Sequence, residues 1–186
     1  YNLSISIDSL ENKIFEITGN KFNIGSPKQL GEILFEQMKI EGGKRSKNGS
    51  WQTSVDVIEN ISNDGHEIGD LILDWRHFSK LKSTYSDALV TQINSETNRV
   101  HTSYSMVGAS TGRLSSSNPN LQNIPIRTDE GKLIRTAFEA KEGFTLVSMD
   151  YSQIELRLIA HIADEKVMLE AFNQNLDIHA DTASKV

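Results

Sequence analysis

The chain has 186 residues, and its 25 Asp and Glu outnumber its 19 Lys and Arg, which gives a net charge of −6. This length fits one ordinary domain or two small ones with a packed core. The acidic balance argues against a protein that coats nucleic acid by bulk charge, although a local basic patch can still bind it. The lack of cysteine excludes disulfide scaffolds, thiolate catalysis and cysteine-based zinc sites. No run of about 18 apolar residues is present to span a membrane.

The first half of the sequence predicts helices. Apolar residues spaced over positions 10–17 predict a helix that ends at Gly19. Ser26 and Pro27, a hydroxyl cap and a proline suited to the first helical position, open a second helix, which should run to Gly42. A shorter helix should follow, up to a turn at residues 63–65.

The longest pattern predicts a helix over about residues 67–93. About 25 helical residues would span roughly 38 Å, so this helix needs a partner surface or works as an arm. Its expected inward side chains are Leu71, Trp75, Phe78, Lys82 (by its stem), Tyr85 and Leu89.

The second half changes character. Alternation of side chains over residues 100–106 predicts a strand. Residues 110–127 form a long polar stretch without helical or strand period, and such loops are usually functional. Further strands are predicted over residues 134–139 and 144–149, the second running directly into Asp150. Helical patterns follow, the first from about Ser152.

The segment from Asp150 onward gives the sharpest signal for chemistry. A carboxylate between a strand and a helix is placed where α/β frameworks handle metals or phosphates. The alternative is a solvated residue at a strand end or a charge on the helix dipole. Glu155 either completes a capping box with Ser152 or points at a substrate. Arg157 lies on the polar face of the same helix, where a solvated Arg is common.

Polar and basic side chains gather in further patches. In the long loop, amide and guanidinium groups suit the acceptors of the DNA minor groove and phosphates, unless they satisfy the loop's own backbone. A glycine-rich basic loop and one basic turn of the long helix have the same ambiguity, but such patches are notable in an acidic chain. These patches contain Arg113, Asn118, Asn120, Gln122, Asn123 and Arg127 in the long loop, Lys44, Arg45 and Lys47 in the basic loop, and Arg76 and Lys80 on the helix.

Three segments closely resemble the signature of family A DNA polymerases, the family of bacterial DNA polymerase I. They are Thr111–Ser116 (TGRLSS), Pro119–Pro125 (PNLQNIP) and Asp150–Arg157 (DYSQIELR). The similarity continues through residues 81–85 (LKSTY) and 100–104 (VHTSY), so it covers nearly the whole chain.

The resemblance implies an α+β fold with two parts. Residues 1–93 would form the helical thumb, which includes the long arm helix. Residues 94–186 would form the N-terminal part of the palm, a small antiparallel sheet with flanking helices, truncated before the fingers.

The resemblance also implies roles for the residues that follow the last predicted strand. Asp150 is similar to one of two aspartates that hold a catalytic Mg²⁺ pair, with the Tyr151 carbonyl as a further ligand. Residues Ser152, Gln153 and Ile154 would lie beside the incoming nucleotide. Glu155 resembles the steric gate, the residue that excludes a ribose 2′-hydroxyl. The resemblance thus implies that Asp150 and Glu155 are the catalytic residues of this chain.

For DNA, the resemblance implies that Arg113 reads the minor groove at the primer end. Asn120, Gln122 and Gln153 would lie along the nascent duplex, and the thumb would hold the DNA backbone. The full set of implied DNA contacts is Arg113, Asn120, Gln122, Asn123, Arg127, Arg76, Lys80, Lys44, Arg45, Lys47 and Arg157.

The implied function is that of a fragment of a DNA-directed DNA polymerase, which transfers deoxynucleotides to a primer 3′-hydroxyl by a two-metal mechanism in replication or repair. Its partners would be primer–template DNA, deoxynucleoside triphosphates and Mg²⁺, in the bacterial cytoplasm with the nucleoid. The second metal-binding Asp and the nucleotide-binding helix are expected beyond Val186, so we expect the fragment alone to be inactive and prone to self-association. The alternative is a non-catalytic DNA-binding module; the presence of both Asp150 and Glu155 favours the polymerase.

Overall fold

The computed structural model describes residues 3–183, which form two compact units that divide between Phe138 and Glu139. Each unit has a hydrophobic core of its own. Residues 1–2 and 184–186, which belong to the predicted thumb and palm, lie outside the described residues. The regular structure of the described part consists of helices and small antiparallel sheets, which confirms the α+β fold class. None of its helices combines the length and the apolar character needed to cross a membrane.

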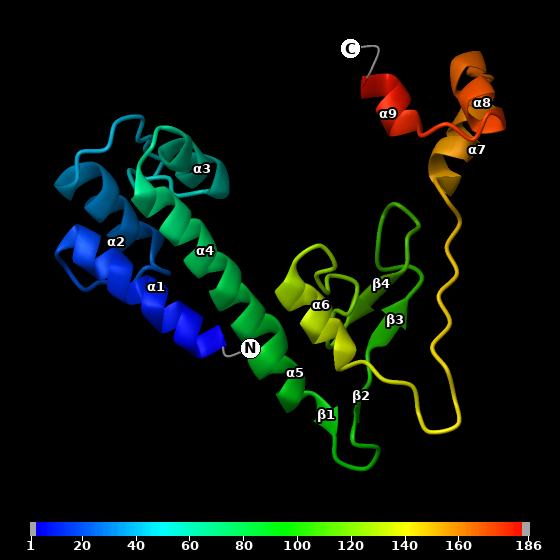
Figure 1. Cartoon of the computed structure of the whole chain (residues 1–186), viewed down its shortest axis with the longest axis horizontal. Coiled ribbons are helices and arrows are strands. Elements are labelled where there is room, and N and C mark those ends of the chain that lie inside the picture. The colour runs from blue at the N-terminus through cyan, green and yellow to red at the C-terminus, as the bar shows by residue number, and fades with distance from the viewer. Residues whose placement is uncertain (1–2, 184–186) are drawn as a thin grey trace. The chain divides into compact units, whose positions relative to one another are not determined.

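Helices dominate the first part of the N-terminal unit (Figure 1). They are α1 (Leu3–Thr18), α2 (Pro27–Gly31), the π-helical segment η1 (Glu32–Gln37), α3 (Val55–Asn63), α4 (Glu67–Leu81), the π-helical segment η2 (Lys82–Asp87) and α5 (Ala88–Thr91). The start signal at Ser26 is confirmed. Pro27 is the first helical residue, and Ser26 Oγ accepts a hydrogen bond from the Gln29 N–H at 3.5 Å.

The helix that begins at Pro27 ends earlier than predicted. Its helical backbone stops at Gln37, before the expected end at Gly42. Lys39 adopts a left-handed φ of +57°, and the Ile40 N–H then donates to the Leu34 carbonyl at 3.0 Å. This turn brings Ile40 into the core, where it is only 8% exposed. Burial of one more apolar side chain therefore ends the helix before the glycines do.

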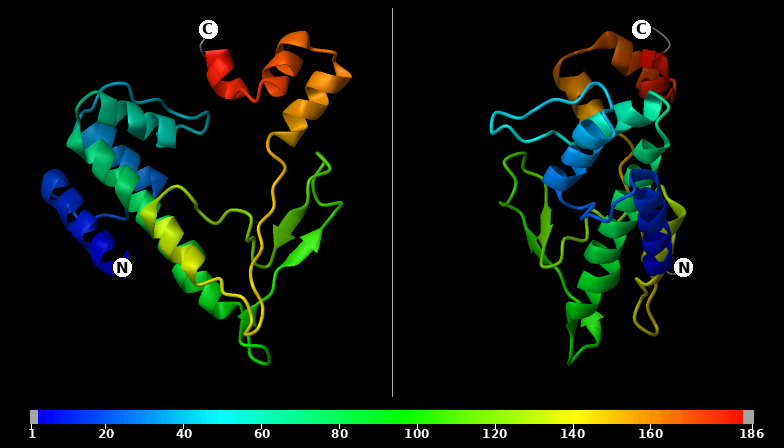
Figure 2. Two further views of the ribbon diagram at one scale, coloured as in Figure 1. Left: turned by 45° about the vertical axis from the view of Figure 1, so that its right-hand side comes forward. Right: turned by 90° about the vertical axis from the view of Figure 1, so that its left-hand side faces the viewer.

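Helix α4 is the centre of the N-terminal core. Helices α1 and α3 both pack against it, and α1 runs beside it in both views of Figure 2. The predicted stripe of α4 began at Leu71 and omitted Ile68 and Ile72, which are buried. With two helices packed on it, α4 needs a wider apolar face than a single stripe supplies. The largest fully buried side chains of the described residues are Ile14, Leu30, Leu34, Ile58, Ile68 and Ile72.

The long helix predicted over residues 67–93 is confirmed. Helical backbone continues through α4, η2 and α5 from Glu67 to Thr91, with a change from α- to π-helical hydrogen bonding at Lys82. The expected inward side chain Tyr85 is buried at 6% exposure. The helix thus extends beyond the core and carries contacts to the segments that follow it in sequence.

Two antiparallel pairs of short strands follow in the described residues. Strand β1 (Ile93–Asn94) pairs with β2 (Arg99–Val100), and β3 (Ser103–Ser105) pairs with β4 (Ser115–Ser117). The strand predicted over residues 100–106 is therefore present in part, as two short pieces. The stretch 110–127 was predicted to lack strands, and β4 corrects that prediction. A run of serines has no polarity alternation, yet its backbone can still complete a ladder with β3.

The strand predicted over residues 134–139 is wrong, because helix α6 (Asp129–Thr136) occupies the first half of that segment and no strand follows it there. Thr128 caps this helix, since its Oγ1 accepts a hydrogen bond from the Gly131 N–H at 3.1 Å. Gly131 also packs closely on Pro125: a Cβ at Gly131 would lie 2.6 Å from the Pro125 Cβ. The cap and this close contact decide the local structure.

The strand predicted over residues 144–149 is also wrong. These residues have no strand partner within the described part of the chain. Their side chains are exposed, with Phe144 at 72%, Val147 at 74% and Met149 at 91%. A short apolar run forms a strand only when a neighbour pairs with its backbone. Asp150 therefore follows irregular, exposed backbone and not a strand edge.

The C-terminal unit is a small group of helices. They are α7 (Ile154–Ile162), α8 (Lys166–Asn173) and α9 (Ile178–Ala183). Ala160, Ala171, Phe172 and Ile178 form the core between them. This core is small because most other apolar residues of the unit are exposed.

The helix caps of the C-terminal unit differ from those predicted. The N-cap residue of α7 is Gln153, in the left-handed conformation with φ of +54°, and not Ser152. The cap of α8 is Glu165, whose side chain accepts a hydrogen bond from the Val167 N–H at 3.4 Å; Asp164, the expected cap, has a φ of +51°. Each helix begins after a left-handed turn that the sequence pattern did not indicate.

The central position of Ile58 predicts a large stability effect. Ile58→Ala should lower the free energy of unfolding by about 2–4 kcal/mol, because the side chain is fully buried and truncation leaves a cavity. Val55→Ala is the matched control on the same helix, since Val55 is 52% exposed, and it should change stability by less than about 0.5 kcal/mol. Urea unfolding followed by circular dichroism measures both; equal effects would contradict the assigned core.

Candidate functional site

The polar loop of residues 110–127 is held in place by hydroxyl groups. Thr102 Oγ1 lies 2.6 Å from Ser116 Oγ and donates to the Pro119 carbonyl at 2.7 Å. Ser116 Oγ in turn accepts a hydrogen bond from the Leu121 N–H at 3.1 Å. Ser116 is only 5% exposed, so this network is largely shielded from water. The loop therefore has a defined conformation on the β3–β4 pair.

Tyr85 connects the same loop to the long helix. Its hydroxyl, at the end of a buried side chain, donates a hydrogen bond to the Asn123 carbonyl. Burial raises the pKa of the Tyr85 hydroxyl above the ordinary value for tyrosine. His77 on α4 and Glu130 on α6 add a longer contact of 3.9 Å between the two helices.

The amides predicted to contact DNA also shape the loop. Gln122 Nε2 donates to the Leu114 carbonyl at 2.8 Å, and Asn120 Oδ1 accepts from the Gln122 N–H at 2.9 Å. The alternative raised by the sequence, that these amides satisfy the loop's own backbone, is thus correct for these atoms. Arg113, Asn120, Gln122, Asn123 and Arg127 are all exposed on this preformed loop.

The two basic residues on α4 have different surroundings. Arg76 is half-buried, and its Nη1 donates to the Thr53 carbonyl at 2.7 Å, which ties α4 to the residues before α3. Burial lowers the pKa of the Arg76 guanidinium from its ordinary value. Lys80, one turn further along, is exposed. Lys80 is therefore the more accessible cation of the pair.

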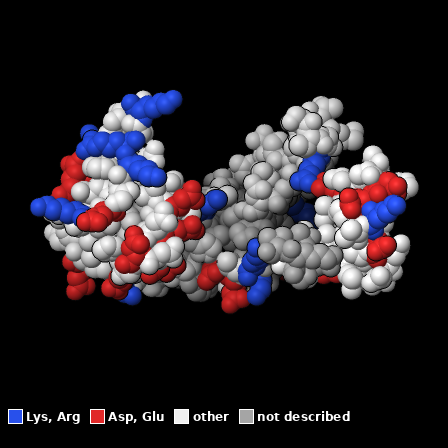
Figure 3. All heavy atoms as spheres, turned by 90° about the horizontal axis from the view of Figure 1, so that it is seen from above, with Lys and Arg blue, Asp and Glu red and all other residues white. Residues whose placement is uncertain are grey.

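The basic loop folds as a short hairpin. An antiparallel bridge joins Arg45 to Trp51, the Ser46 N–H donates to the Ser50 carbonyl at 2.7 Å, and the Gly49 N–H donates to the Ser46 carbonyl at 2.9 Å. Lys47 is exposed at the turn. Figure 3 shows basic side chains gathered on one protruding edge of the helical part of the chain drawn at the left, with acidic side chains spread over much of the rest of that part.

The residues of the DYSQIELR segment gather in the C-terminal unit. Asp150, Tyr151 and Ser152 are exposed before α7, and Glu155 lies in the first turn of that helix. The left-handed Gln153 separates the two groups. A carboxylate and the neighbouring backbone carbonyl are hard oxygen donors, which is the ligand type that Mg²⁺ prefers. The donor set at Asp150 and Tyr151 therefore fits Mg²⁺ chemically.

No group of three or more His, Cys, Asp or Glu residues within the described part of the chain is arranged to hold a metal ion. Asp150 and Tyr151 are thus at most a partial set of ligands, and Mg²⁺ bound there would need oxygen donors from elsewhere.

Arg157 packs within the C-terminal unit. Its Nε donates to the Ser152 carbonyl at 3.0 Å, and its guanidinium lies 4.4 Å from the centroid of the Phe172 ring. The side chain therefore connects the start of α7 to α8. Contact of Arg157 with DNA stays a prediction.

Sequence reasoning missed several residues that shape these segments. Thr102 and Ser116 lie within segments that the sequence analysis singled out, but nothing in the sequence indicated that their hydroxyls hold the loop. Glu36, which contacts Arg45 and Trp51, lies 9 positions before Arg45 and has no motif of its own. The sequence signal for these contacts was limited to an aromatic residue, Trp51, beside the basic loop.

Comparison with known proteins gives a consistent result. A family model described as DNA polymerase family A matches residues 1–186. The chain is 55% identical to DNA polymerase I of Rhizobium leguminosarum over 95% of its length and 17% of the relative's. It is 49% identical to DNA polymerase I of Caldicellulosiruptor bescii, over 95% of the chain and 21% of the relative. The corresponding values for Bacillus subtilis DNA polymerase I are 47%, 99% and 21%. The chain thus spans about a fifth of the length of these relatives.

The fold is also similar to a solved structure. This is the POL domain of Pol1 from M. smegmatis in complex with DNA primer-template and dNTP, with a TM-score of 0.86 and 37% sequence identity. The match covers 98% of this chain and 32% of that chain.

The contact between Tyr85 and the loop predicts a pH-dependent stability. Tyr85→Phe should lower the free energy of unfolding by about 0.5–1.5 kcal/mol near neutral pH, because the Asn123 carbonyl loses its donor. The raised pKa of Tyr85 means that the folded state favours the neutral hydroxyl, so this advantage is present below about pH 10 and is lost as the pH rises further. The difference between the wild type and the variant should shrink from pH 9 to 11 in urea titrations. A constant difference would contradict the assignment.

Proposed function

Because the chain belongs to DNA polymerase family A, we propose that it forms part of a DNA-directed DNA polymerase, which adds deoxynucleotides to a primer 3′-hydroxyl. The observation that supports this most directly is the fold similarity, at a TM-score of 0.86 over 98% of the chain, to a polymerase domain solved with primer-template and dNTP. The identity of 55% to a DNA polymerase I supports the same activity. The bacterial relatives favour the bacterial cytoplasm, with nucleoid DNA as the substrate.

In this proposal residues 1–93 form the thumb and residues 94–186 the N-terminal part of the palm. The compact units divide elsewhere, between Phe138 and Glu139. Contacts such as that of Tyr85 with Asn123 join the loop 110–127 to the long helix. The loop therefore belongs to the same compact unit as the helices. A functional boundary and a packing boundary need not coincide.

Asp150 and Tyr151 would hold Mg²⁺ through the carboxylate and the backbone carbonyl. When bound, a Mg²⁺ pair supplies charge stabilisation for an in-line displacement at phosphorus. The residues of this chain contribute hard oxygen ligands on an exposed segment just before α7. Ser152, Gln153 and Ile154 would line the position of the incoming nucleotide. Glu155, in the first turn of α7, would exclude a ribose 2′-hydroxyl from that position.

The loop 110–127 would contact the minor groove of the nascent duplex. Acceptors in that groove are similar for every base pair, so a donor such as Arg113 can bind there without preferring a sequence. The hydrogen bonds from Gln122 to Leu114 and from Tyr85 to Asn123 would keep the loop in one conformation for this contact. Lys80, Arg76 and the basic hairpin would contact phosphates, which supply affinity and register.

We also propose that the 186-residue polypeptide self-associates when isolated. Exposed apolar side chains in the C-terminal unit support this, including Phe144, Val147 and Met149 at 72–91% exposure. Exposed apolar side chains that gather in one region usually mark a site that another surface covers.

Replacement of the proposed metal ligand tests the assignment. In the full-length gene product, Asp150→Asn should lower the rate of primer extension with Mg²⁺ by at least about a thousandfold, because the loss of a metal ligand removes several kcal/mol of charge stabilisation. Binding of primer-template should change little. Asp164→Asn is the matched control: Asp164 lies in the same unit with a left-handed φ of +51°, which Asn tolerates, so activity should persist. Normal extension by Asp150→Asn would show that the metal assignment is wrong.

The 186-residue polypeptide by itself should bind duplex DNA weakly and fail to extend a primer. Two-metal catalysis needs more hard ligands than Asp150 and Tyr151 supply, and the net charge of −6 disfavours DNA binding. Primer extension with Mg²⁺ and all four deoxynucleotides measures the activity, and fluorescence anisotropy over a salt series measures binding. Extension by this polypeptide alone would refute the expected inactivity, while binding without any salt dependence would count against phosphate contacts.

A further inference from the structure

We propose that Glu36, Arg45 and Trp51 form a brace that fixes the conformation of the basic hairpin, residues 44–52, before DNA binds. In this arrangement Arg45 and Glu36 are positioning residues, and Lys44 and Lys47 make the phosphate contacts. The proposal rests on the proposed function, because it specifies how the thumb would hold the DNA backbone.

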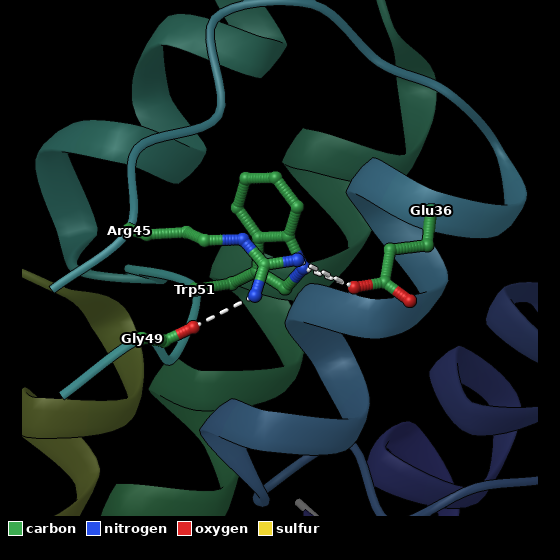
Figure 4. Close-up of polar contacts among 4 residues, drawn as sticks. All are labelled: Glu36, Arg45, Gly49 and Trp51. Atoms are coloured by element: carbon green, nitrogen blue, oxygen red, sulfur yellow. Dashed lines mark hydrogen bonds and ion pairs between the residues drawn. The ribbon is translucent and has the colours of Figure 1, made fainter.

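The brace centres on one oxygen atom. Glu36 Oε1 accepts a hydrogen bond from Trp51 Nε1 at 2.8 Å and another from Arg45 Nη2 at 2.9 Å (Figure 4). The other terminal nitrogen of Arg45, Nη1, donates to the Gly49 carbonyl at 2.8 Å. The guanidinium also lies 4.2 Å from the centroid of the Trp51 ring, within cation–π range. Arg45 thus connects helical segment η1, the hairpin turn and the far side of the hairpin.

The Trp51 ring anchors the brace to the core. It lies 4.9 Å from the Phe35 ring, and Phe35 is a buried member of the core cluster. Two glycines allow this approach: a Cβ at Gly31 would lie 2.3 Å from the Trp51 Cβ, and a Cβ at Gly43 would lie 2.6 Å from the Phe35 ring. Such distances exclude any side chain at either position without a shift of Trp51 or Phe35. The hairpin is therefore attached to rigid structure at its base.

The brace changes which cations are available to DNA. Lys44, Arg45 and Lys47 are all exposed, but the positive charge of Arg45 is paired with the Glu36 carboxylate at 2.9 Å. A hairpin fixed in advance presents these lysines without the ordering cost that a flexible loop carries on binding. The basic loop would then contribute about two phosphate contacts from Lys44 and Lys47, not three.

The charge of Glu36 makes the proposal testable, because the two interpretations predict opposite changes in DNA affinity when Glu36 is neutralised. If Glu36 were only a surface carboxylate, its neutralisation would strengthen DNA binding, because a negative charge near the phosphates disappears. If Glu36 holds the brace, the same change releases Arg45 and loosens the hairpin, so binding weakens. If the fixed conformation is then populated a third to a tenth of the time, Kd rises by about three- to tenfold.

The experiment measures duplex binding by the 186-residue chain with fluorescence anisotropy at several salt concentrations. Glu36→Gln should raise Kd by about three- to tenfold. Glu32→Gln, an equal loss of charge one helical turn earlier at an exposed position, should leave Kd unchanged or lower it. Lys44→Ala combined with Lys47→Ala should reduce the slope of log K against log salt by about 2, as expected for two phosphate contacts. Binding by Glu36→Gln as tight as that of the wild type, or tighter, would overturn the proposal.

A second measurement reports on the brace without DNA. Hydrogen exchange of the Trp51 indole N–H, followed by NMR, should accelerate several-fold in Glu36→Gln, because the charged acceptor is lost. The Trp75 indole, which donates to Glu11 at 2.9 Å, is the internal reference and should not change. Unchanged Trp51 exchange would overturn the brace itself. Absence of duplex binding by the wild type, with the indole effect present, would instead refute the proposed function and leave the brace as a purely structural feature.

Discussion

The N-terminal unit depends on the burial of helix α4 against α1 and α3. This packing fixes a helix that continues to Thr91, well beyond the core, and other segments attach along its length. Arg76 holds the segment before α3, while Tyr85 holds the loop 110–127 through the Asn123 carbonyl. Because a helix is stiff over this distance, the burial of apolar side chains near one end sets the position of polar groups near the other. Loss of the core packing would therefore disturb the proposed DNA contacts as well as stability.

Several polar and basic side chains on the segments proposed to face DNA already have partners within the protein. Gln122 bonds the Leu114 carbonyl, Arg76 the Thr53 carbonyl, and Arg45 the Glu36 carboxylate. Such bonds reduce the conformational-entropy cost of DNA binding, because the side chains or their loops are already ordered before DNA binds. These bonds also give the cations different roles. The half-buried guanidinium of Arg76 stabilises the local structure, whereas an exposed lysine such as Lys80 can face phosphates. A count of basic residues in the sequence does not distinguish these two roles.

The errors in the predicted structure have a common physical origin. A strand was predicted over residues 134–139, but the Thr128 cap and the close packing of Gly131 on Pro125 select helix α6. The run 144–149 had the composition of a buried strand, yet no described segment pairs with it. Strand β4 was missed for the opposite reason, since its serines lack alternation while their backbone pairs with β3. Strands depend on distant partners, which a local pattern cannot reveal.

The sequence by itself determined the family resemblance, the α+β class, the long helix and the identity of the candidate residues around Arg113 and Asp150, because motifs, caps and helical periodicity are local properties of the chain. Tertiary structure alone decided which polar groups are engaged inside the protein. Glu36 meets Arg45 and Trp51, and Tyr85 meets Asn123 across 38 positions, only once the helices have packed. The physical reason is that hydrogen bonds and ring contacts act over a few ångströms in space, so a local sequence pattern does not reveal partners that lie far apart along the chain.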